Sequence, residues 1–66
     1  MKTNLKTARI EKGLTQGEAA NKCGITQQRL SHYETGIRQP PIEVFRKLAD
    51  IYGVSLDYLL QEPEEA

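Results

Sequence analysis

The chain of 66 residues has a formal net charge of zero, one cysteine and 38% hydrophobic residues. This length favours one small domain with a modest core. A single cysteine excludes an internal disulfide and a cysteine-based zinc site. The sequence shows no long apolar run and no signal peptide, so we expect a soluble cytoplasmic protein without membrane contact.

The charge is unevenly distributed along the chain. Glu62, Glu64 and Glu65 lie among the last five residues, and residues 1–61 hold nine basic and six acidic side chains, a net charge of +3. A basic surface can exist on a neutral protein, so the zero total does not exclude a nucleic-acid partner. We expect residues 1–61 to form the domain and residues 62–66 a short acidic tail.

A first helix is predicted to end near Lys12, with Asn4 or Thr3 as its cap. Far along the chain, apolar residues repeat at intervals of three and four over residues 42–52, which predicts an amphipathic helix. Its apolar stripe consists of Ile42, Phe45, Leu48, Ala49 and Tyr52. Ser55 can cap a short last helix.

Residues 15–36 predict two more helices, over about 16–23 and about 27–34. Thr15 and Glu18 have the spacing of a capping box at the start of the first. A glycine between the helices can adopt the left-handed conformation that ends a helix and turns the chain. Small or apolar residues fall where two crossing helices would face inward: Ala19, Ala20, Cys23, Ile25, Leu30 and Tyr33. This is a helix-turn-helix pattern, whose second helix is free to enter a major groove.

The motif and its flanks resemble the Cro/repressor-type (Xre-like) helix-turn-helix family, to which the lambdoid phage repressors belong. The resemblance covers nearly the whole chain and rests on Leu5, Arg9, Gly13-Leu14-Thr15-Gln16, Ala20, Gly24, Thr26-Gln27-Gln28, Tyr33-Glu34, Gly36, Val54-Ser55 and Asp57-Tyr58-Leu59-Leu60. It implies an all-α, five-helix, lambda-repressor-like DNA-binding domain, encoded by a bacterium or a phage.

The resemblance also implies that the second motif helix reads bases. Gln27 and Gln28 match the Thr-Gln-Gln run that reads bases in a lambdoid repressor, and a glutamine amide can pair with adenine N6 and N7. Ser31 and His32 complete the expected base-reading set. The alternative is a solvated helix surface that reads nothing.

Residues around the motif are expected to contact DNA phosphates. Gln16 lies at the start of its helix, where amides and the helix dipole favour an anion. The other expected phosphate contacts are Thr15, Arg29, Thr35, Arg38 and Gln39. Arg29 can instead point into water.

Arg9 lies on the apolar face of the first helix, and the resemblance implies a partly buried ion pair between Arg9 and Glu34. The alternative is a solvent-exposed arginine without consequence. One domain reads too few base pairs to find a single genomic site, so we expect a homodimer on a palindromic operator. The expected dimer interface is Tyr52, Leu56, Tyr58, Leu59 and Leu60. If all five pack internally, the dimer forms only on DNA.

These features favour a sequence-specific transcriptional regulator, in particular a repressor that blocks a promoter by occupying it. The alternative is an antitoxin-like protein that binds a protein partner and autoregulates its operon. His32 is the only histidine, and no nucleophile, paired carboxylates or ligand cluster accompanies it. We therefore expect no catalytic residue, metal, cofactor or small-molecule ligand.

Overall fold

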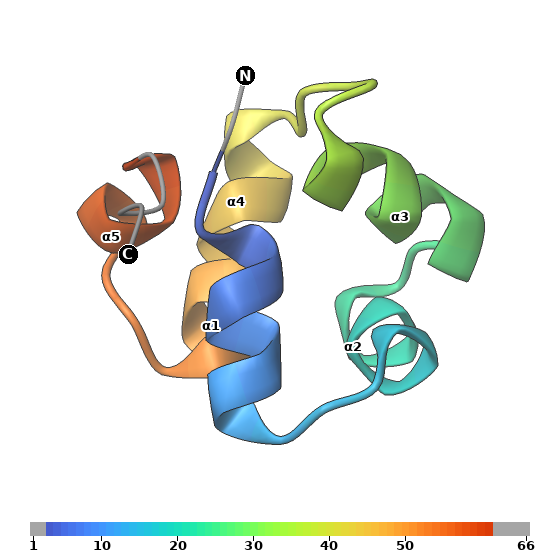
Figure 1. The fold of residues 1–66 in the computed structure, drawn as a ribbon, viewed down its shortest axis with the longest axis horizontal. Coiled ribbons are helices and arrows are strands. Elements are labelled where there is room, and N and C mark those ends of the chain that lie inside the picture. The colour runs from blue at the N-terminus through green and yellow to red at the C-terminus, as the bar shows by residue number, and fades with distance from the viewer. Residues whose placement is uncertain (1–2, 62–66) are drawn as a thin grey trace.

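The computed structural model describes residues 3–61 and folds them into five helices, without a strand in that range. The helices are α1 (Leu5–Lys12), α2 (Gln16–Cys23), α3 (Gln27–Thr35), α4 (Ile42–Tyr52) and α5 (Leu56–Leu60). In Figure 1, α1 lies in front of α4 at the centre, with α2 and α3 on one side and α5 on the other. The predicted all-α fold is confirmed. The expected acidic tail at residues 62–66 lies outside the described residues.

The core lies where α4 meets the other helices. Its largest fully buried side chains are Leu5, Leu30, Phe45, Leu48 and Leu59. Helix α4 contributes the phenylalanine and one leucine, and α1, α3 and α5 contribute one leucine each. In α2 the buried positions are small, with Ala19 and Ala20 at 0% and 2% exposure. Small side chains let α2 approach both α3 and α4 closely. None of the helices within residues 3–61 is long and apolar enough to cross a membrane.

Capping contacts fix the ends of the motif helices. Thr15 Oγ1 accepts a hydrogen bond from Glu18 N–H at 3.1 Å, and Glu18 Oε1 accepts one from Thr15 N–H at 3.0 Å. Thr26 Oγ1 accepts one from Arg29 N–H at 3.1 Å and starts α3. Gly24 has a φ of 78°, a left-handed conformation that other residues rarely adopt, and it ends α2. Local sequence therefore sets these boundaries.

Two details outside the motif differ from expectation. Asn4 precedes α1, but its side chain does not cap that helix, whereas Oγ1 of the other predicted cap, Thr3, accepts a hydrogen bond from Leu5 N–H at 3.4 Å. Instead Asn4 Nδ2 donates to the Tyr58 carbonyl oxygen at 2.9 Å, and Asn4 N–H donates to the Leu59 carbonyl oxygen at 3.1 Å. These bonds join the start of α1 to α5. Ile42 was expected in the buried stripe but is 48% exposed, because it lies in the first turn of α4, before the fully buried residues that begin at Phe45.

Tyr52 places a hydroxyl in the core without a hydrogen-bond partner among residues 3–61. Its side chain is 4% exposed. Burial, and next the negative charge of Glu34, raise the pKa of Tyr52 to about 12. An unsatisfied buried hydroxyl lowers stability by about 1–3 kcal/mol. The ring of Tyr52 therefore stabilises the core, while its hydroxyl lowers the stability of the fold.

Tyr52→Phe is expected to raise the free energy of unfolding by about 1 kcal/mol in urea titrations at pH 7. Because the folded pKa lies above the unfolded value, folding favours the neutral phenol of Tyr52 over its phenolate, and the fold keeps its full stability below pH 10. That stability is lost as the pH rises toward 12. The variant should therefore lose less stability over this interval. At pH 7, Tyr58→Phe is the control for removal of a hydroxyl, because the Tyr58 hydroxyl is exposed and donates to Glu11 Oε1 at 3.0 Å. A clear destabilisation by Tyr52→Phe would contradict this account.

Candidate nucleic-acid interface

The two sides of α3 have different environments. Leu30 and Tyr33 are buried in the core. The other residues of its first two turns are exposed or half-buried polar side chains: Gln27, Gln28, Arg29, Ser31 and His32. Since Thr26 fixes the first turn, these side chains project from a rigid helix rather than from a loop. Such a helix can present donors and acceptors to base edges.

An open groove runs between α3 and the loop that follows it. Its lining residues are Thr26, Gln28, Arg29, His32, Tyr33, Arg38 and Gln39. Five of these were predicted from the sequence to contact DNA: Gln28, Arg29, His32, Arg38 and Gln39. Two lining residues are arginines and none is acidic. The groove therefore favours an anionic partner.

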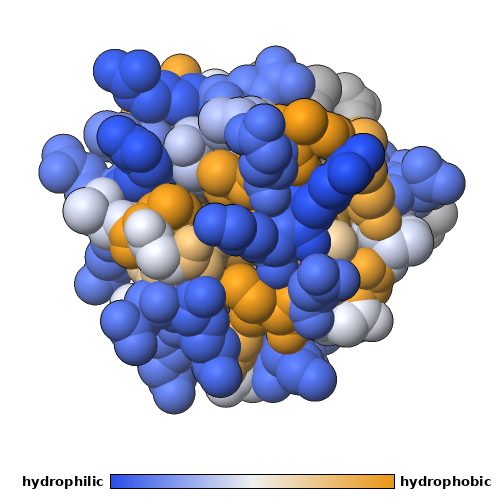
Figure 2. Space-filling model, turned by 180° about the vertical axis from the view of Figure 1, so that it is seen from behind, coloured by the Kyte–Doolittle hydropathy of each residue, from blue (hydrophilic) through white to orange (hydrophobic). Residues whose placement is uncertain are grey.

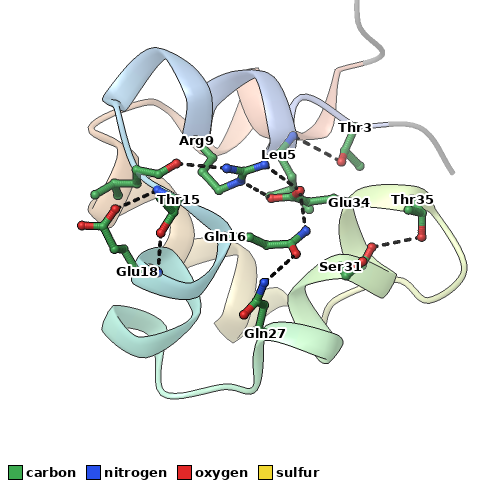
Figure 3. Close-up of polar contacts among 11 residues, drawn as sticks. Thr3, Leu5, Arg9, Thr15, Gln16, Glu18, Gln27, Ser31, Glu34 and Thr35 are labelled. Carbon is green, nitrogen blue, oxygen red and sulfur yellow. Dashed lines mark hydrogen bonds and ion pairs between the residues drawn. The ribbon is translucent and has the colours of Figure 1, made fainter.

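The loop after α3 folds back on the end of the helix. Arg38 N–H donates to the His32 carbonyl oxygen at 3.2 Å, which holds Arg38 beside α3. Thr35 Oγ1 donates to the Ser31 carbonyl oxygen at 3.0 Å (Figure 3). A phosphate oxygen needs a donor. Thr35 can supply one only if its hydroxyl turns away from the helix.

The start of α2 presents a second group of backbone donors. The amides of Thr15 and Glu18 are satisfied by the capping box. The amides of Gln16 and Gly17 have no hydrogen-bond partner among residues 3–61, and such first-turn amides favour an anion. Hydrogen bonds from the Thr15 backbone and side chain hold the pKa of the Glu18 carboxyl below its ordinary value. The resulting negative charge opposes an anion at this place.

A polar network connects the core to the start of α3 (Figure 3). Arg9 Nε and Nη2 donate to the two carboxylate oxygens of Glu34, at 2.7 and 3.3 Å. This is the ion pair that the resemblance implied. Its Arg9 side chain is 12% exposed and its Glu34 side chain is 3% exposed. Gln16 Nε2 donates to Glu34 Oε1 at 3.1 Å, and Gln16 Oε1 accepts from Gln27 Nε2 at 3.4 Å. The side-chain donor of Gln16 is thus engaged, and its backbone amide remains for a phosphate.

Two residues expected at a dimer interface belong to the core instead. Tyr52 and Leu59 are 4% and 0% exposed, so both are withdrawn from that interface. The apolar run of a short helix does not reveal which side faces inward. Leu56 and Tyr58 are half-buried, and Leu60 is 38% exposed. The view from behind, in Figure 2, shows apolar patches separated by hydrophilic side chains rather than one continuous apolar surface.

Gly17 is a residue of this interface that the sequence analysis missed. It lies in the first turn of α2, and a Cβ built on it would lie 3.4 Å from Gln27 Oε1. Glycine is a poor helix former, and the chain makes no turn at this position. A glycine inside a predicted helix was therefore the available signal.

Histidine, cysteine, aspartate and glutamate are the side chains that most often bind metals in proteins. Within residues 3–61, no group of three or more His, Cys, Asp or Glu side chains is placed to hold a metal ion. Cys23 is buried in α2, and this burial raises the pKa of its thiol. Cys23 is thus packed as a small apolar residue.

Two crossing helices, a left-handed turn and an exposed polar side of α3 define a small helix-turn-helix domain. The chain belongs to the Cro/repressor-type helix-turn-helix family, since a family model described as helix-turn-helix matches residues 5–59.

Named relatives support this assignment. The chain is 47% identical over 60 residues to the HTH-type transcriptional regulator ImmR of Bacillus subtilis (strain 168), covering 91% of this chain and 47% of that protein. It is 34% identical over 62 residues to the cryptic phage CTXphi transcriptional repressor RstR of Vibrio cholerae, covering 94% of this chain and 56% of that protein. The N-terminal DNA binding domain of SinR from Bacillus subtilis superposes with a TM-score of 0.81 at 34% identity. The match covers 92% of this chain and 90% of that domain's chain. The chain spans about half the length of the curated relatives.

Proposed function

We propose that this protein is a DNA-binding transcriptional regulator that places α3 in the major groove of a specific operator. The groove beside α3 carries this proposal, because its lining combines polar side chains that can pair with base edges and two arginines, without an acidic residue. The descriptions of ImmR as a transcriptional regulator and of the SinR domain as DNA-binding support it.

Within this proposal, the side chains divide into two roles. Gln27, Gln28, Ser31 and His32 read base edges, and Gln28 contributes most because it is exposed and lines the groove. Phosphates are contacted by Arg29, Arg38 and Gln39 along the groove, and by Thr15 and the first-turn amides of α2. The phosphate contacts supply affinity, and the base contacts supply specificity.

The proposed regulator is a repressor that occupies a palindromic operator as a homodimer. The description of RstR as a transcriptional repressor supports this mode of action. Since Tyr52 and Leu59 are buried, the proposed dimer surface consists of the other three residues, Leu56, Tyr58 and Leu60 on α5. This helix and α3 lie on opposite sides of the central pair of helices (Figure 1), so one surface can bind a second copy while α3 binds DNA. Half-sites would lie about one helical turn of DNA apart.

Leu60→Glu is expected to weaken binding to a palindromic duplex by about tenfold or more, because it places a charge in the proposed apolar contact. The protein would be titrated onto the palindrome and onto a duplex with one half-site, both taken from selection on random DNA. The number of protein chains bound to each duplex would be measured. Half-site binding is the internal control and should not change, since Leu60 lies on α5, away from α3. One chain per palindrome, or unchanged cooperativity in Leu60→Glu, would refute the dimer.

A further inference from the structure

Gly17 is a glycine that the backbone of α2 does not require. It lies within the helix and is not among the glycines with positive φ, which are Gly13, Gly24, Gly36 and Gly53. Any residue can adopt its conformation, and most would favour the helix more than glycine does. The reason for a glycine at this position must therefore lie outside the helix backbone.

The space beside Gly17 is occupied by one side chain. A Cβ at this position would lie 3.4 Å from Gln27 Oε1 and 3.9 Å from Gln27 Cδ, and no other atom of residues 3–61 outside the local chain lies within 4 Å. A methyl group would therefore just touch the Gln27 amide. A branched side chain would extend into the space that the amide occupies.

The Gln27 amide is also held from its other end. Gln27 Nε2 donates to Gln16 Oε1 at 3.4 Å, and Gln16 is itself bound to Glu34 (Figure 3). The nitrogen of the Gln27 amide thus points at Gln16, while its oxygen lies against Gly17. Residues of α2 therefore surround a side chain of α3 from two directions.

We propose that Gly17 is a specificity-determining residue, which positions Gln27 for base reading by leaving room for its amide across the start of α2. This inference rests on the proposed function, because it assigns a role within the same DNA-binding site. Gly17 does not read a base itself. A larger residue would move the Gln27 amide and change the preference at one base pair of each half-site.

The test compares Gly17→Val, Gly17→Ala and the matched control Asn21→Val, an exposed position one turn later on α2. The full chain is first used to select duplexes from a random DNA library. Affinities are then measured for the selected duplex and for its single-base-pair variants at fixed salt. Gln27→Ala identifies the base pair that Gln27 reads, and thermal melts show that each variant is folded.

At that base pair the wild type is expected to discriminate by about tenfold or more, and Gly17→Val by about twofold or less. Gly17→Ala and Asn21→Val should keep the wild-type preference. In the Gln27→Ala background, Gly17→Val should cause no further change in preference. In the free protein, Gly17→Val should shift the side-chain amide resonances of Gln27 and leave those of Gln28 unchanged.

Wild-type discrimination by Gly17→Val, or a loss spread evenly over all base pairs, would overturn this inference and leave the proposed function intact. The same holds if Gln27→Ala changes no base preference on a selected duplex. If the library yields no preferred sequence, the proposed function fails and this inference fails with it.

Discussion

Replacing Arg9 by methionine is expected to lower the free energy of unfolding by about 3–5 kcal/mol, the cost of leaving a buried charge without its partner. The Glu34 side chain is 3% exposed, and Arg9 supplies two of the donors to its carboxylate. Without Arg9, Gln16 remains as a neutral donor at 3.1 Å. A domain of this length has only about 3–10 kcal/mol of stability in total, so the variant should be close to unfolding. Urea denaturation followed by circular dichroism measures the change.

Two further variants identify the cause of this destabilisation. Arg46→Met removes an exposed arginine of α4 and should change stability by less than about 0.5 kcal/mol. The double variant Arg9→Met/Glu34→Met removes both charges and should recover most of the loss, because no ion then remains buried. A loss below about 1 kcal/mol for Arg9→Met would show that the ion pair is only a surface contact.

Replacing Gln28 by alanine is expected to reduce affinity for the selected operator by about 2–6 kcal/mol on a palindrome, since one bidentate base contact of about 1–3 kcal/mol is lost in each half-site. This corresponds to about 30-fold or more. Binding to unrelated DNA should hardly change, because Gln28 carries no charge. Fluorescence anisotropy at fixed salt, with the selected duplex and its single-base-pair variants, measures both effects.

The controls for Gln28 separate base reading from phosphate binding. Gln61→Ala changes an exposed glutamine just after α5 and should leave affinity and preference unaltered. Arg38→Ala should weaken binding to all sequences about equally and make the salt dependence less steep by about one charge for each chain. If Gln28→Ala keeps the wild-type preference at every base pair, Gln28 does not read a base.

The fold was predictable wherever local sequence decides the structure. The capping box of Thr15 and Glu18 and the left-handed Gly24 depend only on neighbouring residues, and the predicted range 16–23 coincides with α2. The periodic apolar residues located α4 in the same way. The predicted range 27–34 misses the last residue of α3, which extends to Thr35.

Contacts between distant segments were not predictable from the same signals. Asn4 bonds to the backbone of α5, 54 residues further along the chain, which no local capping pattern indicates. The burial of Tyr52 and Leu59 depends on how α4 and α5 face each other. In the candidate site, the residue types on α3 followed from the pattern, whereas the engagement of Gln16 and the contact of Gly17 with Gln27 appear only in three dimensions.

Selection of the full chain on a random duplex-DNA library, at about physiological salt where non-specific binding is weak, tests the central proposal most directly. We expect an enriched palindrome with half-sites about one helical turn apart. Repeating the selection with Gln28→Ala should relax one base pair in each half. A library that shows no enrichment, although the protein is folded, would contradict the assignment as an operator-binding regulator.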